Sequence, residues 1–597
     1  MSDHASAPHR DARNARPTAG SPRPSRIAGL SATTAARLAI LALIALAAWL
    51  GLRSLTAVPE LVGADAPSTV FSAERALVDL RALTAAPRPV GSPANAAARD
   101  YLLAQISALG LEPQVQQTNV LRHEPGFPET HLMPVENVLV RLPGTVPGGK
   151  ALLVSGHYDS VSTAVGASDC GMCAATTLET LRTVVAATAA GQPPRNDVIF
   201  LFTDAEEIGV AGAQGFMRDH PWAADVGLSL VFEALGNDGA PLLYIAGPES
   251  GAVVGEALDA LATGAARPLA SSFLHDFMWT VAGNTGSDLD AFVEGAPGLG
   301  FIYLSLETVA AYHTDADSAA NLDPRSLQGM GDFAVTLTHH FANRPLDDRP
   351  AWPNLVLFPL WPGMMARYSS ALALPLAIAA AALLAVALFF GLQRGALSGR
   401  GVLASFAAWL PALLVAVLLA SAAWGLVRLL TPHLHNFTAG GWWGSGFYLA
   451  AALALGLAVA VAWRGLLRRF AAADLLGGMA LWWALLALLT AAALPGLSYL
   501  FVWPLLPLAA ALAVVGWSTD DRRRTTVTVV PGPWSTALLG LAAAVAALLF
   551  APVANWRWSS RPGGGRWRGR LAWRWRSRRY SAGRVCWPSH PPRRPGR

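Results

Sequence analysis

Between residues 150 and 343, short apolar runs alternate with longer mixed stretches. Four of the runs have the length and composition of buried strands: Lys150–Ser155, Asp197–Thr203, Leu228–Phe232 and Gly300–Leu304. Between the first two, Cys173–Ala190 is rich in Ala, Leu and Thr, which indicates a crossover helix. Strands that alternate with helices predict an α/β fold, with a mostly parallel mixed sheet flanked by helices.

A second pattern consists of apolar stretches long enough to cross a bilayer, which takes about 20 residues. Ala36–Leu52 comes first. It could be a cleaved signal peptide, but the long polar tail before it and the lack of a clear A-x-A site favour a retained anchor. Six more stretches follow the α/β region: Ser370–Leu392, Val402–Val427, Phe447–Trp463, Leu475–Leu494, Leu497–Trp517 and Trp534–Ala551. One such stretch is often a buried core helix, but six in succession predict an all-α multi-span membrane bundle.

Composition agrees with a membrane protein of several domains. The chain has 597 residues, of which 53% are hydrophobic and 14% charged, and its mean hydropathy is +0.39. Three cysteines exclude a disulfide scaffold. The expected organisation is a disordered basic cytoplasmic tail (1–35), an anchor (36–55), the α/β domain (72–343), a proline-containing linker (344–369), the bundle (370–551) and an Arg/Trp-rich tail (552–597).

Charge predicts the orientation. The tail before the anchor is basic, so the positive-inside rule places it in the cytoplasm and the α/β domain outside. That side is the periplasm for a bacterial inner membrane, or a lumen in a eukaryote. Continuing the count of spans puts three arginine-bearing loops inside: Arg394/Arg400, Arg464/Arg468/Arg469 and Arg522/Arg523/Arg524.

The final segment departs from this rule. Residues 555–597 contain 13 arginines, six tryptophans and no acidic residue, and without them the net charge changes from +5 to −8. Interleaved Arg and Trp can bind an anionic membrane or nucleic acid. An exported arginine-dense tail nevertheless contradicts the charge pattern of the other loops. We therefore interpret it as a frameshifted or misannotated reading frame and expect no nucleic-acid partner.

Residues that can bind metal follow the ends of the predicted strands. The six are His157, Asp169, Glu206, Glu207, Glu233 and His313. In a parallel sheet, ligands gather beyond the carboxyl ends of the strands, and most of these residues lie at or just past such an end. Imidazole and carboxylate oxygen suit zinc. Two zinc ions need one bridging carboxylate, further ligands for each ion and a base for water, and this series can supply all of them.

Two local arrangements add to this chemistry. Asp159 lies two residues after His157, where it can accept the second ring N–H and fix the tautomer. Glu206 and Glu207 are adjacent, so in a loop one can bind metal while the other takes a proton from water.

The motifs around these residues resemble a known family. G-H-Y-D-S, G-A-S-D-x-G, D-A-E-E-x-G and Y-H-T-x-x-D are similar to the catalytic motifs of dizinc exopeptidases related to aminopeptidase Y and glutamate carboxypeptidase. P-R-P-V-G-S-P-A-N at 87–95 resembles an upstream segment of the family's membrane-embedded branch, which includes endoplasmic reticulum metallopeptidase and fungal vacuolar membrane protease. S-D-L-D-A-F at 287–292 resembles a further family segment before the last ligand. The resemblance covers roughly residues 72–343 and implies a zinc exopeptidase (phosphorylase/hydrolase-like) fold.

The resemblance also implies roles for individual residues. Asp169 bridges two Zn²⁺ ions, His157 and Glu233 complete one site, and Glu207 and His313 complete the other. Glu206 is the general base and Asp159 orients His157. Peptides are the implied substrates, and hydrolysis at the N-terminus is the implied reaction. Two departures stand out: many soluble members have Asp in place of Glu233, and Cys170 stands where a second Asp is usual.

Alternatives remain open for the function and for some residues. A catalytically idle receptor-like or assembly homologue is disfavoured by the intact ligand set. A single-zinc acyltransferase of the glutaminyl cyclase type would need only Asp169, Glu207 and His313. Cys170 and Cys173 have C-x-x-C spacing, which can indicate a redox pair or metal ligands. Two small residues opening a helix are the commoner case, with an incidental disulfide possible in an oxidising compartment. The remaining histidines that we considered are interpreted as surface or packing residues: His220, His275, His339 and His340.

Overall fold

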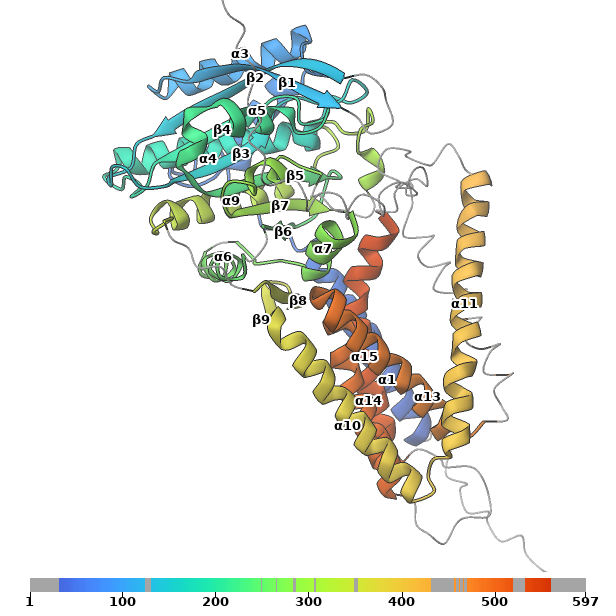
Figure 1. The fold of residues 1–597 in the computed structure, drawn as a ribbon. Helices are drawn as coiled ribbons and strands as arrows, with labels where there is room; N and C mark the ends of the chain where they lie inside the picture. Colours follow the sequence, from blue (N-terminus) through green and yellow to red (C-terminus); the bar gives the residue numbers. More distant parts are fainter. Residues whose placement is uncertain are drawn as a thin grey trace, which may run out of the picture.

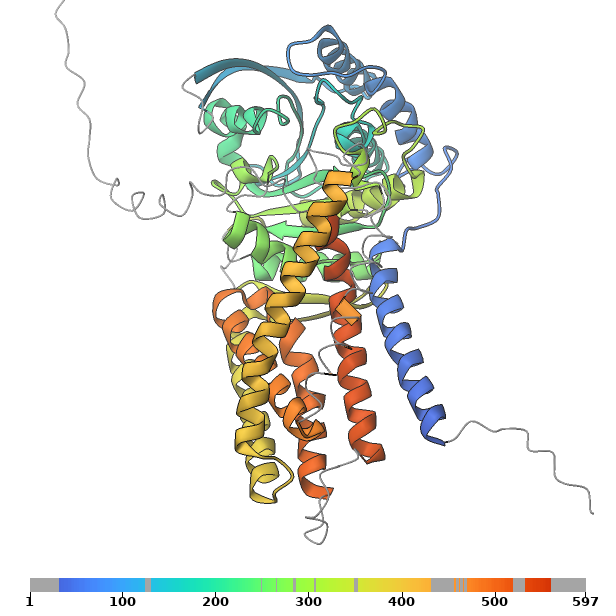
Figure 2. The same ribbon diagram turned by 90° about the vertical axis from the view of Figure 1, so that its right-hand side faces the viewer.

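The computed structural model describes residues 32–123, 130–247, 250–264, 266–282, 286–304, 308–347, 353–430, 456–457, 461, 465, 470–518 and 532–559. An α/β domain sits at one end of a group of long helices (Figures 1 and 2). The strands of its main sheet are β1 (Gln114–His123), β2 (Thr130–Leu142), β3 (Ala151–His157), β4 (Val198–Thr203), β5 (Val226–Leu235), β6 (Pro241–Ala246) and β7 (Gly298–Leu304).

The described residues form a seven-stranded mixed sheet with the order β1-β2-β4-β3-β5-β7-β6. The four central strands, β4, β3, β5 and β7, are parallel to one another, whereas β2 and β6 run antiparallel to their neighbours. The carboxyl ends of the four parallel strands therefore meet at one edge of the sheet. All residues of β3 and β4 are buried, as expected for strands covered on both faces.

Helices cover both faces of this sheet. Those of the α/β domain are α2 (Ala73–Leu83), α3 (Pro93–Ala108), α4 (Cys173–Ala189), α5 (Ala211–Asp219), α6 (Gly251–Thr263), α7 (Ser272–Asp276), α8 (Leu289–Phe292) and α9 (Pro324–Ala342). One core layer packs alternate strand residues such as Val154 and Phe200 with α2, α4 and α9. The other packs Leu153 and Ile199 with residues of α5 and α8. Alternation of side chains along each strand produces these two layers.

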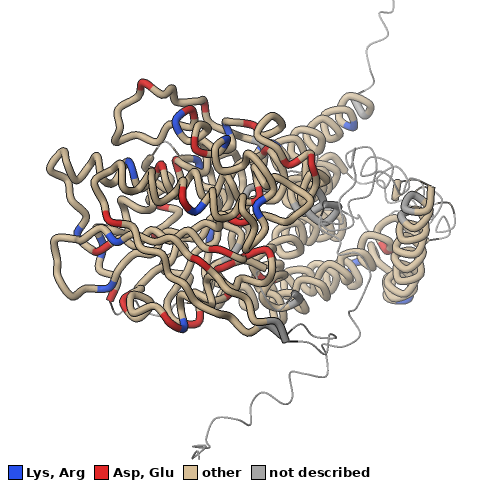
Figure 3. The backbone as a smooth tube through the Cα atoms, turned by 90° about the horizontal axis from the view of Figure 1, so that it is seen from above, with Lys and Arg blue, Asp and Glu red and all other residues tan. Residues whose placement is uncertain are grey.

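The long apolar helices lie beneath the domain. They are α1 (Ala32–Thr56), α10 (Ala373–Gln393), α11 (Gly399–Leu430), α13 (Ala472–Ala493), α14 (Tyr499–Ser518) and α15 (Pro533–Ser559). Within the described residues, six helices are long and apolar enough to cross a membrane. Helix α1 packs along α15, and α10 packs along α14. Seen from above, the acidic and basic residues gather over the α/β domain, while the helices are almost free of them (Figure 3).

A small hairpin joins the two parts. Within the segment expected to be a linker, β8 (Leu355–Trp361) pairs with β9 (Met364–Ser369). Phe358 of this hairpin stacks on Tyr499 at the start of α14, with ring centroids 4.6 Å apart. One hydrophobic core runs from the sheet through the hairpin into α10, α13 and α14. The α/β domain is therefore packed directly against the helices and is not connected to them by a flexible linker alone.

The predicted α/β architecture is confirmed. The four predicted strands correspond to β3, β4, β5 and β7, and the predicted crossover helix corresponds to α4. Strand β5 is longer than expected and continues two residues beyond Glu233, to Leu235. The predicted span Phe447–Trp463 lies almost entirely outside the described residues, as do the arginines at 464, 468, 469 and 522–524.

Candidate metal centre

The candidate ligands lie together at the edge of the sheet where the parallel strands end. His157 is the last residue of β3, and Glu233 lies near the carboxyl end of the adjacent β5. Glu206 and Glu207 follow β4 after two residues, while His313 comes from the segment after β7. All of these side chains are at least largely buried, which removes much of the competition from bulk water.

Two groups of donor atoms share one carboxylate. His157, Asp169, Cys170 and Glu233 form the first group, and Asp169, Glu207 and His313 form the second. In the first group, His157 Nε2 lies 3.3 Å from Asp169 Oδ1 and 3.7 Å from Glu233 Oε2.

In the second group, His313 Nε2 lies 3.0 Å from Asp169 Oδ2 and 2.9 Å from Glu207 Oε2. The two oxygens of Asp169 thus face different groups, which is the arrangement of a bridging ligand.

Asp159 connects the first histidine with the glutamate pair. Its Oδ1 lies 3.2 Å from His157 Nδ1 and also accepts a hydrogen bond from the Glu206 backbone N–H, at 3.1 Å. Its Oδ2 accepts from the Glu207 backbone N–H, at 3.3 Å. One carboxylate therefore orients the His157 ring, leaving Nε2 toward the donor group, and holds the turn that carries both glutamates.

The turn that carries Asp169 is held from two sides. Asp317 accepts hydrogen bonds from the backbone N–H groups of Ser168 and Asp169, at 2.7 and 3.1 Å. Gly166 has φ +58°, and a Cβ there would lie 2.2 Å from the Asp169 carbonyl oxygen, so the turn requires glycine. The Asp169–Cys170 peptide bond is cis.

A fully buried arginine also holds the loops that carry His157 and Asp169. Arg88 donates hydrogen bonds to the carbonyl oxygens of Tyr158, Val165 and Gly166. These carbonyls flank the loops that carry His157 and Asp169, so Arg88 ties the two loops together. From the sequence alone, the P-R-P segment gives no role to Arg88. An arginine between two prolines ahead of a helix was the available signal, but buried arginines are too rare to be expected from sequence.

The electrostatics of the centre are those of an anionic site. Burial, with the charge of Glu233, raises the pKa of Glu206 well above its ordinary value, and burial with Asp169 raises the pKa of Glu207 to about 7. Burial disfavours a charged His313, but Asp169 and Glu207 raise its pKa to about 10. The carboxylates therefore favour a proton or a cation between them.

The donor set fits zinc. Several buried donor atoms make no well-aligned hydrogen bond among the described residues, although His313 Nε2 and Asp169 Oδ2 lie 3.0 Å apart: His157 Nε2, Asp169 Oδ2, Glu207 Oε1, Glu233 Oε1 and His313 Nε2. Buried polar atoms without partners are rare and point to an ion at the site. Ligand atoms on a tetrahedral zinc ion lie roughly 3.3–3.6 Å apart, given the usual zinc–ligand bond lengths. The distances from His157 Nε2 to Asp169 and Glu233 lie close to this range.

The other singled-out residues lie away from these donor groups, except for the cysteine pair. His220 Nδ1 accepts from the Trp222 backbone N–H, His275 lies between the Ala246 N–H and Asn354, and His340 pairs with Glu256 at 2.8 Å. Cys170 and Cys173 form a disulfide at the start of α4. Cys170 is also a member of the first donor group.

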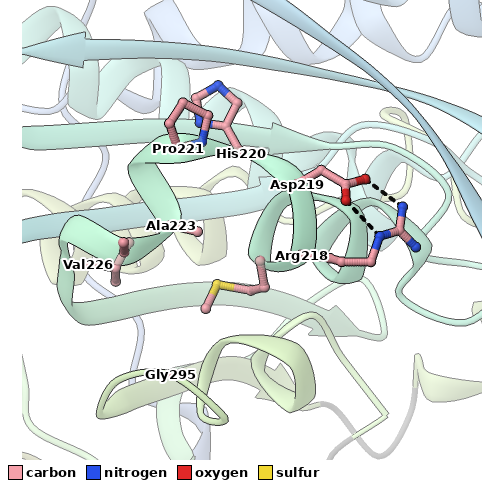
Figure 4. Close-up of a pocket in the computed structure, with 9 residues that line it drawn as sticks. Arg218, Asp219, His220, Pro221, Ala223, Val226 and Gly295 are labelled. Atoms are coloured by element: carbon pink, nitrogen blue, oxygen red, sulfur yellow. Dashed lines mark hydrogen bonds and ion pairs between the residues drawn. The ribbon is translucent and has the colours of Figure 1, made fainter. Parts of the chain in front are cut away.

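A groove of about 480 Å³ lies beside α5, the turn Pro221–Asp225 and Gly295 (Figure 4). Its charged residues, Arg218 and Asp219, pair with each other at 2.5 Å. None of the candidate ligands lines it, so it is separate from the metal centre.

Known proteins are similar to the part of the chain that contains the candidate ligands. Residues 137–338 match the family model described as Peptidase family M28. Endoplasmic reticulum metallopeptidase 1 of Mus musculus is 30% identical over 210 residues, covering 35% of this chain and 22% of that protein. Vacuolar membrane protease of Candida albicans (strain SC5314) is 31% identical over 245 residues, covering 41% of this chain and 27% of that protein. The chain thus spans about a quarter of the length of these relatives.

Two solved structures are similar to part of this chain at low sequence identity. An aminopeptidase from Aneurinibacillus sp. strain AM-1 has 15% identity and a TM-score of 0.37, with 48% of this chain and 98% of that chain covered. A glutaminyl cyclase from Porphyromonas gingivalis has 17% identity and a TM-score of 0.36, with 45% and 97% covered.

The fold is a mixed α/β sheet with imidazole and carboxylate donors gathered at the edge where its parallel strands end. Residues 137–338 match the model of peptidase family M28, and apolar helices of membrane-spanning length follow this region.

Proposed function

We propose that this protein is a membrane-anchored zinc exopeptidase that uses two Zn²⁺ ions to remove N-terminal residues from peptides. The observation that carries the proposal is the shared Asp169 carboxylate, whose two oxygens face two separate donor groups. The family match and the membrane-protease relatives support peptide hydrolysis, and the choice of the N-terminus rests on the family resemblance.

Each candidate residue has a defined task in this reaction. His157 and Glu233 would hold one ion, Glu207 and His313 the other, and Asp169 both. When bound, such ions acidify water and polarise the scissile carbonyl.

Glu206 belongs to neither of the two donor groups, and its Oε2 lies 3.9 Å from His157 Nε2. It would accept the proton of the attacking water and return it to the leaving amine. Asp159 would act by keeping His157 and both glutamates in place.

The placement of arginines supports one orientation of the chain in the membrane. The turn between α10 and α11, which carries Arg394 and Arg400, lies at the end of the helices away from the α/β domain (Figure 1). The Arg394 guanidinium lies over the Trp517 ring, 4.1 Å from its centroid, so α14 also ends there. By the positive-inside rule, this end faces the cytoplasm and the peptidase domain faces the periplasm or a lumen.

The test is hydrolysis by the full chain in detergent. Aminoacyl-chromophore substrates and N-blocked peptides would be compared with and without added zinc, in wild type and in Glu206→Gln. The amide keeps the size of the side chain but cannot accept the proton. We expect kcat to fall by about 10²–10⁴-fold, with little change in bound zinc. Glu112→Gln, an exposed carboxylate of the same domain, is the matched control and should keep wild-type kcat.

The outcomes separate the alternative functions. Zinc-dependent release of free N-terminal residues that is lost in Glu206→Gln supports the aminopeptidase. Cyclisation of N-terminal glutamine by protein carrying one zinc ion would favour the acyltransferase. A folded protein that binds no zinc would leave the receptor-like reading.

A further inference from the structure

The cysteine pair beside the metal centre has no place in the proposed reaction. Cys170 directly follows the shared ligand Asp169, and Cys173 begins α4. Both side chains are fully buried, and the two sulfurs are joined in a disulfide. The third cysteine of the chain, Cys586, lies outside the described residues.

The sulfur of Cys170 faces the first donor group. Its Sγ lies 3.8 Å from Glu233 Oε2, and all four possible donors, from His157, Asp169, Cys170 and Glu233, lie within 4.8 Å of one another. Because a zinc–sulfur bond is about 2.3 Å long, a sulfur and an oxygen on one tetrahedral zinc ion lie roughly 3.6 Å apart. Cys170 is therefore close to the place that a fourth zinc ligand would take.

The oxidation state decides whether this sulfur can bind. In a disulfide, Sγ has no thiolate charge to offer, so the first site has three protein donors and an open position. As a thiolate, the same sulfur completes a set of four. Catalytic zinc sites keep an open position for water, whereas sites with four protein ligands are structural and closed.

We propose that Cys170 and Cys173 are a redox switch of the first metal site: their disulfide leaves the site open and active, and their reduction lets Cys170 close it. This inference rests on the proposed two-zinc function. It concerns the choice between two ligand sets of the same ion and requires no movement of the sheet.

The chemistry balances with a dithiol as the reductant. The S–S bond between Cys170 and Cys173 breaks and accepts two electrons and two protons, giving two thiols. The two S–H groups of the dithiol lose the same electrons and protons and form one disulfide. On binding zinc, the Cys170 thiol releases its proton to solvent.

Two substitutions in the full chain separate the roles of the sulfurs, both made in a Cys586→Ser background. Cys173→Ser leaves the Cys170 sulfur free in every preparation, so the first site should be closed. Activity should fall by about 100-fold or more relative to the oxidised parent, while zinc is retained, because a closed site has no position for water. Cys170→Ser removes the closing sulfur, so its activity should be the same in oxidised and reduced preparations, whatever its level.

Reduced parent protein provides the free sulfur without any substitution at the pair. Because both cysteines are buried, the reduced form is purified in a dithiol, which is removed before metal is added. Thiols are then counted after denaturation. We expect two thiols, retained zinc and the same loss of activity as in Cys173→Ser. This preparation keeps the test decisive if Cys173→Ser folds poorly.

Cobalt provides a readout that does not depend on hydrolysis. Co²⁺-loaded Cys173→Ser and reduced parent should show a thiolate-to-cobalt charge-transfer band in the near ultraviolet, and oxidised parent and Cys170→Ser should not. Absence of the band in Cys173→Ser, or full activity in that variant, would overturn the switch. If oxidised parent shows no zinc-dependent hydrolysis, the proposed function fails instead, and the cobalt band still reports whether Cys170 binds metal.

Discussion

At the scale of single residues, the centre depends on side chains that bind no metal themselves. Asp317 is the clearest case, because its two carboxylate oxygens accept from the N–H groups of Ser168 and Asp169. These contacts fix the peptide units from which the shared carboxylate extends. The two contacts need two acceptor oxygens, which an aspartate has and an asparagine lacks.

We therefore predict that Asp317→Asn weakens zinc binding by about 10–100-fold, the usual cost of losing a group that orients a metal ligand. The amide NH₂ would face one of the backbone N–H groups and displace the Asp169 turn. Competition with a chromophoric chelator measures the affinity. Asp315→Asn is the matched control, since Asp315 is exposed in the same segment. Wild-type zinc affinity in Asp317→Asn would rule out this role.

The donor residues and the nearby support Asp159 could be predicted from sequence, but the roles of Arg88 and Asp317 could not. His157, Glu206 and Glu207 follow apolar runs that are recognisable as parallel strands, and such strands end at one edge. Arg88 and Asp317 act on backbone groups 77 and 148 residues away along the chain. Sequence patterns report local periodicity and give no sign of such distant contacts.

At the scale of elements, the same limit applies to the edge strands. Strand β1 reads Q-V-Q-Q-T-N-V-L-R-H, which is too polar to be recognised as part of a sheet. Strand β1 is held in the sheet by its pairing with β2 along ten residue pairs, which its own polar sequence does not predict. The short helix α7 was likewise not predicted, because five residues carry little periodicity.

Helix α7 also fastens the α/β domain to the apolar helices, beside the β8–β9 hairpin. Ser272 Oγ donates toward the carbonyl oxygens of Leu357 and Gly496, at 3.0 and 2.8 Å, and the Gly496 N–H donates to Asp276 Oδ2, at 2.6 Å. Gly496 lies in the turn between α13 and α14. A Cβ there would lie 2.6 Å from the Ser272 carbonyl oxygen, so only glycine allows this approach.

Asp276 should make this junction pH-dependent. Burial raises its pKa to about 6, although the Gly496 N–H favours the charged form. The folded state therefore holds the proton more tightly than the unfolded chain, whose aspartates titrate near 3.9. The stabilisation is complete below about pH 4 and is lost as the pH rises to about 6.

Asp276→Asn keeps an oxygen for the Gly496 N–H and cannot ionise. We predict that its thermal midpoint in detergent rises relative to wild type between pH 4 and pH 7, by the equivalent of roughly 2–3 kcal/mol at most. Asp65→Asn, at an exposed carboxylate of the same domain, should show no such trend. A difference between Asp276→Asn and wild type that stays constant with pH would contradict the assignment.

At the scale of the whole molecule, the peptidase domain and the helices form one packed unit. Helix α1 precedes the domain and α15 follows it by some 200 residues, yet they lie side by side (Figure 2). Small residues allow the approach: a Cβ at Gly51 would lie 2.5 Å from the Leu548 carbonyl oxygen, and one at Gly540 would lie 2.9 Å from Ile40. The helix before the domain is therefore part of the bundle.

This packing leads to a definite prediction for the two ends of the molecule. The domain and the α10–α11 turn lie at opposite ends of the helices, so they must face opposite sides of a bilayer that these helices span (Figure 1). Because the turn carries Arg394 and Arg400, we predict that it faces the cytoplasm. In a Cys586→Ser background, Glu112→Cys on the exposed surface of the domain should react with a membrane-impermeant maleimide in intact spheroplasts. Gly399→Cys at the turn should react only after permeabilisation.

Labelling at both positions, Glu112→Cys and Gly399→Cys, distinguishes the possible orientations of the chain. Cys170 and Cys173 are buried in their disulfide and should remain unlabelled in both samples. Labelling of Gly399→Cys from outside together with protection of Glu112→Cys would reverse the orientation and place peptide hydrolysis in the cytoplasm. Labelling of both sites from outside would mean that the helices do not span the membrane, although their length and composition suffice for it. The compartment also matters for the proposed cysteine switch. A disulfide persists only in an oxidising compartment, so only there would the first metal site keep its open position.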